Sequence, residues 1–419
     1  MSAGFPGLVP CVHCGFCLQS CPTYLATGDE ADGPRGRIVL MQSLARGSLG
    51  PDDADLRLHL DRCLGCRACE PVCPSGVRYG ASLEAARARI ADRRGVPVAA
   101  RLVLAVFAQP ALRRPLLFVA RLLRRLVVPF AGGGRLGFVC GMTAATRPGH
   151  WARHDPGSAA SRVFPPARGA AAPFLGCVQR ELFGHVHDAT RRTLAANRIA
   201  TVPVEGQGCC GALHAHAGLH AEAVRLAREN VRAFASRPEA PIVVNAAGCG
   251  AMLRSYADLL PDDPSAVAFA ARVRDVTEVL ADAGPRRGAS LPLRVAYDPP
   301  CHLQHAQGIV DPPLVVLAAV PSLEVVVHAG AEHCCGSAGI YSLLQPELSR
   351  VVLAGKIASL REAAPDCVAT GNPGCAMQIG AGMAAAHLRV PTVHPVELLD
   401  RSYALAGYYT PDLEGRLPA

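Results

Sequence analysis

The spacing of apolar residues predicts several amphipathic helices near the start of the chain. Isoleucine, valine, leucine and methionine recur at helical intervals over residues 36–45 and again over 53–61, which is the pattern of a helix with one buried face. A third helix is predicted over 82–94, where Ser82 is placed to cap the first turn ahead of Glu84.

Residues 96–135 continue this amphipathic pattern with interruptions. Pro110 and Pro115 are expected to break it, because proline disrupts the interior of a helix. The stretch 131–172 is rich in glycine, proline, alanine and arginine, a composition typical of a linker. Residues 132–137 match the letters of a dinucleotide-binding glycine motif, but they lie inside this stretch with no clear helix after them, so the linker interpretation is preferred.

From residue 173 onward a different pattern occurs twice. Short runs of β-branched residues lead into a cysteine, and an amphipathic helix follows, as over 221–235 in the first copy and 346–361 in the second. This repeated order predicts two α/β lobes with cysteines at strand ends, packed as a pseudo-symmetric pair. The intervals between equivalent cysteines agree within one residue. These cysteines are Cys177, Cys209, Cys210 and Cys249 in the first copy and Cys301, Cys334, Cys335 and Cys375 in the second.

The 18 cysteines of this 419-residue chain are clustered rather than scattered, which is typical of metal binding. Apart from the eight above and from Cys140 and Cys367, they lie in two dense runs near the N-terminus. Both runs have the spacing C-x2-C-x2-C-x3-C-P of bacterial ferredoxins. The first run contains Cys11, Cys14, Cys17 and Cys21, and the second contains Cys63, Cys66, Cys69 and Cys73.

This spacing predicts two [4Fe–4S] clusters. Three cysteines two residues apart can curl around one corner of a cubane, while the fourth points away and binds the other cluster. The first cluster is thereby assigned Cys11, Cys14, Cys17 and Cys73, and the second Cys63, Cys66, Cys69 and Cys21. The long helical spacer between the runs indicates an α-helical ferredoxin domain. Zinc, which takes four ligands, typically from two C-x2-C pairs, is the alternative, and metal analysis separates the two.

Charge is placed unevenly along the chain. The formal net charge is +8, and residues 91–150 contain ten arginines with one acid, Asp92. Such a basic, apolar stretch suits an anionic membrane surface or an acidic partner, and a basic helix packed on its own protein is the alternative. Residues 1–10 show no secretory signal, and the apolar run 102–112 is too short to span a bilayer. We therefore expect a cytoplasmic protein that can lie on the inner face of the membrane.

The lobe cysteines and the segments between motifs carry a resemblance to known proteins. The spacing C-x31-C-C-x38-C, repeated with one residue more in each interval, resembles the cysteine-rich CCG domains of heterodisulfide reductase subunits. With the two ferredoxin runs, nearly the whole chain resembles the glycolate oxidase iron–sulfur subunit family. Further segments that carry this likeness are 28–37, 59–63, 73–79, 245–250, 303–307 and 334–339.

The patterns along the chain predict an α+β protein with an α-helical ferredoxin domain (1–90), basic helices and a linker (91–172), and two α/β lobes (173–285 and 286–419). The resemblance implies that these lobes are CCG domains. It implies an electron-transfer subunit without catalytic residues, which takes electrons from FAD-containing glycolate oxidase subunits and passes them to a membrane quinone or another carrier. Nucleic acid is not an expected partner. The alternatives are the iron–sulfur subunit of an anaerobic glycerol-3-phosphate or lactate dehydrogenase complex and a thiol–disulfide reductase.

The lobes depart from the CCG pattern at one position each. In heterodisulfide reductases the last cysteine of the motif belongs to a C-x-x-C pair, and here Ala246 and Asn372 replace the first member of that pair. Each lobe therefore keeps four cysteines. A third iron–sulfur cluster, a thiol-lined quinone or partner site, and a structural role all remain open for these eight residues.

Some histidines and arginines near the cysteines give weaker indications. One histidine set does not share a single helix face, so we expect it at the solvated surface: His214, His216 and His220. Another set flanks the lobe-two cysteines and is expected to hydrogen-bond to sulfur: His302, His305 and His333. Arg35 and Arg37 either place positive charge near a cluster or cap a loop.

Overall fold

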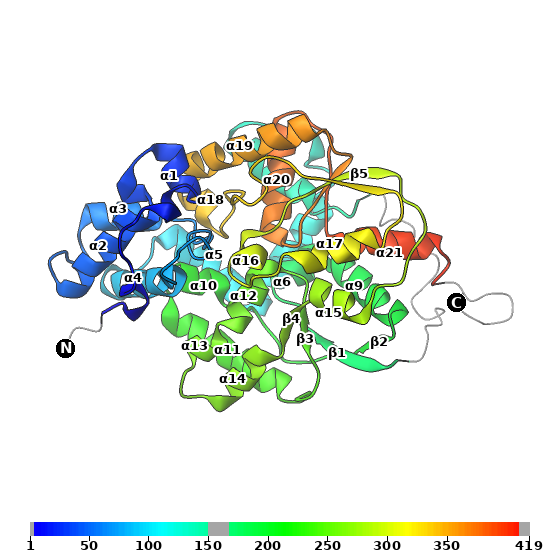
Figure 1. Cartoon of the computed structure of the whole chain (residues 1–419), viewed down its shortest axis with the longest axis horizontal. Helices are drawn as coiled ribbons and strands as arrows, with labels where there is room; N and C mark the ends of the chain where they lie inside the picture. The colour runs from blue at the N-terminus through cyan, green and yellow to red at the C-terminus, as the bar shows by residue number, and fades with distance from the viewer. Residues whose placement is uncertain (1–3, 150–166, 410–419) are drawn as a thin grey trace.

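The computed structural model of the chain describes residues 4–149 and 167–409. An all-helical N-terminal part lies at one end of the molecule, and a helical basic segment and two α/β lobes make up the rest (Figure 1). This arrangement confirms the expected fold class, an α-helical ferredoxin-like region followed by two parallel-sheet lobes.

Short helices form the N-terminal part around a small apolar core that includes Met41, Leu56 and Leu83. Asp53 accepts a hydrogen bond from the backbone N–H of Leu56 and so caps α3. The expected cap at Ser82 was wrong, because this residue lies inside α4 and its hydroxyl donates to the carbonyl of Arg78. The elements are η1 (Pro6–Leu8), η2 (Phe16–Leu18), α1 (Pro22–Thr27), η3 (Glu30–Asp32), α2 (Pro34–Arg46), α3 (Ala54–Asp61) and α4 (Tyr79–Arg94).

The basic segment is more helical than its composition indicated. Pro110 starts α6 and does separate two helices, but Pro115 lies in the second turn of α6 without ending it. Part of the expected linker is also a helix, α7, which packs against α20 of the second lobe. The elements are α5 (Val98–Ala108), α6 (Pro110–Leu123), η4 (Val128–Phe130) and α7 (Gly134–Ala145). Residues 150–166 of that linker, including Trp151, lie outside the described residues.

Each lobe contains a four-stranded parallel sheet, and the two sheets have the same topology. The strand orders are β2-β1-β3-β4 and β6-β5-β7-β8, as the sequence duplication predicted. The strands of the first lobe are β1 (Gly169–Pro173), β2 (Ile199–Thr201), β3 (Ile242–Val244) and β4 (Val273–Asp275). Those of the second are β5 (Leu293–Tyr297), β6 (Leu323–Val326), β7 (Cys367–Ala369) and β8 (Thr392–Val393).

Helices join the two lobes by packing across their boundary. α15 of the first lobe packs against α17, and α21 of the second lobe packs against α9. The first lobe contains α8 (Val178–Leu182), α9 (Gly184–Ala196), α10 (Ala212–His216), α11 (His220–Phe234), α12 (Ala247–Arg254), α13 (Tyr256–Leu259), α14 (Pro264–Ala271) and α15 (Val276–Ala283). The second contains α16 (Cys301–Gln304), α17 (Asp311–Ala318), α18 (Tyr341–Leu344), α19 (Pro346–Ala363), α20 (Pro373–Ala385) and α21 (Pro395–Leu405).

Within the described residues, no individual helix combines the length and the apolar character needed to cross a bilayer. The consecutive helices α5 and α6 reach that length only together, and the chain bends by 96° between them.

Candidate functional site

The first group of ferredoxin-type cysteines surrounds one small pocket. The run before Pro22 curls around it through Gly15, which adopts a left-handed conformation (φ +86°) that favours glycine. Burial, together with the neighbouring thiols, raises the pKa of Cys17 to about 11. The cysteines that line this pocket include the four assigned to the first cluster: Cys11, Cys14, Cys17 and Cys73.

The second group is more deeply buried, and its thiols also lie near one another. Burial and the thiols of Cys66, Cys63 and Cys21 raise the pKa of Cys69. The cysteines assigned to the second cluster are therefore brought together by the fold, although Cys21 belongs to the other run of the sequence.

Hydrogen-bond donors surround the sulfur atoms of this second group. The backbone N–H of Gly65 lies 3.4 Å from Cys63 Sγ, and the phenol of Tyr79 donates to the same sulfur at 3.6 Å. Arg37 is fully buried, and its Nη1 lies 4.0 Å from Cys21 Sγ. Arg37 thus places a positive charge beside this group, whereas Arg35 donates to the carbonyl of His13 and pairs with Glu30.

These surroundings fit iron–sulfur clusters. Burial and the neighbouring thiols raise the pKa of Cys17 and so oppose its ionisation, and a bound metal removes that penalty because it compensates the thiolate charge. N–H and O–H donors directed at sulfur are the interactions that adjust cluster potentials.

The eight lobe cysteines line one cavity between the two lobes. Its volume is about 310 Å³, and its other walls are mainly apolar, including Leu64, Phe107, Leu117 and Met142. Each cysteine follows the carboxyl end of a parallel strand, in a loop or at the start of a helix, which is where α/β sheets place their sites. The cysteines are Cys177, Cys209, Cys210, Cys249, Cys301, Cys334, Cys335 and Cys375.

Within the cavity the sulfur atoms approach one another closely. Cys210 and Cys249 are 3.3 Å apart at sulfur, and Cys301 and Cys334 are 4.0 Å apart. Hydrogen bonding to Cys209, together with burial, raises the pKa of Cys177. The backbone is also tightly packed at the second Cys-Cys-Gly motif, because a Cβ atom on Gly336 would lie 2.7 Å from the carbonyl oxygen of Ser349.

Asn372, which occupies the position of a missing cysteine, bridges the two lobes. Its amide nitrogen donates to Cys375 Sγ at 3.4 Å, and its amide oxygen accepts from the backbone N–H of Gly248 at 3.1 Å. Gly248 is adjacent to Cys249 of the first lobe. No sequence pattern indicates this bridge, because Gly248 and Asn372 are 124 positions apart.

The second cysteine group of the ferredoxin part contacts the cavity through lobe two. Cys66 packs in one buried cluster with Cys301 and Cys334. Burial and the neighbouring Cys301 thiol raise the pKa of Cys66. Tyr341 closes this contact by donating its hydroxyl to the carbonyl of Arg62 at 2.8 Å. Cys301 and Cys334 of lobe two are therefore adjacent to the ferredoxin part.

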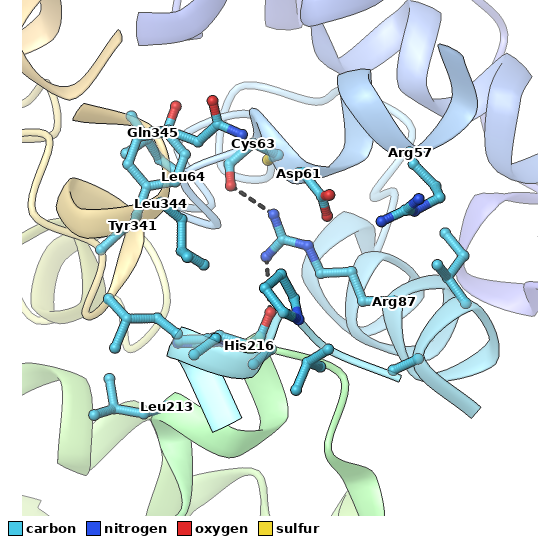
Figure 2. A pocket seen from close by; sticks show the side chains of 18 of the residues that line it. Arg57, Asp61, Cys63, Leu64, Arg87, Leu213, His216, Tyr341, Leu344 and Gln345 are labelled. Atoms are coloured by element: carbon cyan, nitrogen blue, oxygen red, sulfur yellow. Dashed lines mark hydrogen bonds between the residues drawn. The ribbon is translucent and has the colours of Figure 1, made fainter. Parts of the chain in front are cut away.

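Arg87 holds the ferredoxin part against lobe one. Figure 2 shows its guanidinium between Cys63 and His216, in a pocket of about 210 Å³ where the ferredoxin part meets both lobes. It donates to the carbonyls of Leu60, Cys63 and His216. Sequence reasoning missed Arg87, because nothing about an arginine within a predicted helix indicates which distant residues it will contact.

The histidines differ in part from expectation. His214 is buried and contacts the carbonyl of Leu104 rather than solvent, and His216 is half-buried and pairs with Glu84 at 2.8 Å. Only His220 of that set is exposed. In lobe two, His302 Nδ1 lies 3.4 Å from Cys301 Sγ, as expected. The remaining two contact Glu332 instead. His305 contacts the backbone carbonyl of Glu332, and His333 contacts the Glu332 carboxylate.

Comparison with known proteins agrees with this picture. The model of a 4Fe–4S dicluster domain matches residues 7–77, and that of a cysteine-rich domain matches 171–254 and 295–380. The "probable glycolate oxidase iron-sulfur subunit" of Bacillus subtilis is 34% identical over 94% of this chain and 93% of its own length. The "glycolate oxidase iron-sulfur subunit" of Escherichia coli is 32% identical with the same coverage. A "lactate utilization protein A" of Geobacillus kaustophilus is 32% identical over 54% of this chain and 97% of its own length.

A dicluster ferredoxin domain followed by two cysteine-rich α/β lobes defines an iron–sulfur protein of the electron-carrying class. The likeness to its relatives extends along almost the whole chain, through both kinds of domain. The chain belongs to the family of glycolate oxidase iron–sulfur subunits.

Proposed function

We propose that the two ferredoxin-type groups hold one [4Fe–4S] cluster each, with the fourth cysteine of each run exchanged between them. The observation that carries this proposal is the crosswise grouping of the thiols in the folded chain. The first cluster takes Cys11, Cys14, Cys17 and Cys73, and the second takes Cys63, Cys66, Cys69 and Cys21. We also propose that the four sequence segments ending at residues 90, 172, 285 and 419 are the domains of the chain.

In this proposal the protein is an electron carrier. The clusters supply one-electron transfer when bound. The chain contributes burial, the hydrogen bonds of Gly65 and Tyr79 to sulfur, and the fixed charge of Arg37. The lobe cavity then continues the path beyond the second cluster, because Cys301 packs against Cys66. It is the candidate third site.

The relatives indicate where the electrons come from. Two of them are named as iron–sulfur subunits of glycolate oxidase, so we propose that flavin-containing subunits oxidise glycolate or a similar 2-hydroxy acid and reduce this chain. The acceptor is then a membrane quinone or another carrier. To test this, the complex is purified anaerobically, and glycolate, lactate or glycerol-3-phosphate is added separately. The 2-hydroxy acids should bleach the cluster absorbance. Bleaching by glycerol-3-phosphate alone would contradict the assignment.

Iron counting and EPR test the ligand sets. Anaerobically purified wild-type protein should contain about eight irons in its two cubanes, and Cys73→Ser or Cys21→Ser should each remove about four. Because the fourth ligands are exchanged, Cys73→Ser should remove the same EPR signal as Cys14→Ser, and Cys21→Ser the same signal as Cys66→Ser. Iron beyond about eight per chain would assign further iron to the lobes.

Cys140→Ser is the matched control, because this half-buried cysteine of α7 belongs to neither group. It should leave both signals and the iron content unchanged. If Cys73→Ser instead removed the signal that Cys66→Ser removes, the crosswise arrangement would be wrong.

A further inference from the structure

The outer side of α6 is apolar where a surface helix is normally polar. The two buried residues of the helix, Arg113 and Leu117, form its inward side. The opposite side exposes large apolar residues, with Phe118 56% and Leu122 61% accessible. Exposed apolar residues continue through the following turn and η4 to α7. The exposed set is Leu112, Leu116, Phe118, Val119, Leu122, Leu123, Leu126, Val128, Phe130, Leu136 and Val139.

Arginines accompany this apolar surface. Arg114 and Arg121 are seven residues apart and so lie along one flank of α6, and both are exposed, as is Arg125 in the turn that follows. No acid among the described residues pairs with these three. Burial and, after it, the positive charges of Arg121, Arg125 and Arg147 lower the pKa of Arg124, so these arginines lie near one another.

We infer that α6, the turn 124–127, η4 and the start of α7 form a docking face for an anionic lipid bilayer. A helix lying in the membrane interface has an apolar face flanked by basic residues. Phosphate headgroups accept hydrogen bonds from arginine, while the arginine stems lie along the apolar surface. From Pro110 to Val139 no side chain can accept a hydrogen bond, because this stretch contains no acid, serine, threonine, asparagine, glutamine, histidine or tyrosine. It therefore lacks the polar acceptors that a protein interface normally has at its rim.

The geometry favours lying on the membrane over crossing it. α6 has 14 residues, which rise about 21 Å, and a crossing helix needs about 20 residues. The 96° bend before α6 prevents α5 from extending it through the bilayer. The face is also next to the proposed redox cavity, because Leu117 on the inward side of α6 and Met142 of α7 line it. Membrane docking by this face does not depend on the proposed function. Only its purpose, the delivery of electrons to a membrane acceptor, rests on that function.

Vesicle sedimentation with the full chain tests this inference. Binding is measured to vesicles of phosphatidylcholine alone and to vesicles that also contain phosphatidylglycerol. We expect binding only to the anionic vesicles, weakened about tenfold or more by Arg114→Gln with Arg121→Gln. Phe118→Ser with Leu122→Ser should weaken it by a similar factor, because that change removes the inserted apolar surface.

Matched controls come from exposed residues elsewhere on the chain. Arg228→Gln with Arg232→Gln on α11 removes the same charge, and Val267→Ser with Val351→Ser removes exposed apolar side chains of α14 and α19. Neither control should change vesicle binding. Iron content and cluster EPR are measured on every variant, so a failure of the electron-carrier proposal is seen separately.

Three results would overturn the inference. Equal binding to neutral and anionic vesicles would show that charge plays no part in the binding. Equal weakening by test and control variants would show that the face is not special. If the face variants left vesicle binding intact but released a co-purifying flavoprotein, the face would belong to a partner subunit.

Discussion

At the scale of single residues, Arg37 places a buried positive charge beside the proposed second cluster. Its guanidinium is fully buried, donates to Thr23 Oγ1 at 3.0 Å and to the carbonyl of His59 at 2.6 Å, and reaches Cys21 Sγ at 4.0 Å. Asp32 supplies the compensating charge and also pairs with Arg62. A fixed positive charge in a buried setting stabilises added negative charge more than one in water does.

We therefore predict that Arg37→Gln makes the midpoint potential of the second cluster more negative, because reduction adds an electron next to the lost charge. The first cluster should shift less. Arg35→Gln is the comparison, since Arg35 lies beside the first group but is exposed enough for water to screen its charge. An EPR-monitored redox titration measures both potentials, with full iron content as the check of folding. A larger shift in the first cluster would contradict the prediction.

At the scale of elements, His187 fixes α9 against the first sheet in one protonation state. Its Nε2 is 3.1 Å from the carbonyl of Leu175, to which it donates, and its Nδ1 accepts from the side-chain amide of Asn245 at 3.1 Å. Both ring nitrogens of the neutral histidine therefore have a hydrogen-bond partner. Burial lowers the pKa of His187 to about 4, and a proton on Nδ1 would break the bond to Asn245.

This histidine predicts a loss of stability in acid. His187 takes up a proton near pH 6.5 in the unfolded chain but only near pH 4 in the folded chain. Its contribution to the free energy of unfolding is therefore complete above pH 6.5. That contribution falls by about 3 kcal/mol in all as the pH drops to 4. His187→Gln should lower the unfolding midpoint at pH 7.5 but reduce its decline towards pH 5. Thermal unfolding at several pH values measures this, and an unchanged decline in the variant would contradict it. The exposed His220→Gln should retain the wild-type decline.

The contact between α9 and α21 gives a second prediction at this scale. Arg192 of α9 binds both carboxylate oxygens of Asp400, at 2.8 and 2.6 Å, and Asp400 is nearly buried. Arg192→Met should cost about 3 kcal/mol of unfolding free energy, since it leaves a buried carboxylate without its cation. The adjacent Arg191→Met removes only a half-exposed pair with Asp188 and should cost well under about 1 kcal/mol. Equal losses in urea unfolding would show that the lobes are not joined through Asp400.

At the scale of the whole molecule, the two lobes are equivalent in topology but not in their relation to the ferredoxin part. Cys301 packs against Cys66, whereas its counterpart Cys177 packs with Cys209 and Leu226 in a separate cluster. The position of the ferredoxin part breaks the pseudo-symmetry of the lobes. Lobe two is therefore the side on which electrons would enter the cavity.

Variants of these two equivalent cysteines test that asymmetry. Cys301→Ser should move the midpoint potential or alter the EPR line shape of the second cluster, because its sulfur is adjacent to a proposed ligand. Cys177→Ser should leave the second cluster unchanged. The first cluster should be unaffected in both variants and serves as the internal reference. The asymmetry would be refuted if Cys177→Ser had the larger effect.

Most of the fold was accessible from local pattern. The helices around 36–45 and 53–61 and the duplicated strand–cysteine–helix order appear where expected, because apolar periodicity and turn residues act over a few positions. The errors occurred where context overrides composition. α7 forms within a glycine-rich stretch because it packs on α20, and His214 is buried because α5 supplies a carbonyl to it.

The amino-acid sequence by itself determined the cysteine inventory, the ferredoxin spacing, the duplication and the basic segment, since each is a matter of residue type and interval. Only the tertiary structure decided that the eight lobe cysteines share one cavity, that Asn372 joins the lobes, and that α6 exposes its apolar side. These features depend on which surfaces meet in space. Residues more than a hundred positions apart become neighbours through the packing of whole elements. The spacing of residues along the chain does not predict such contacts.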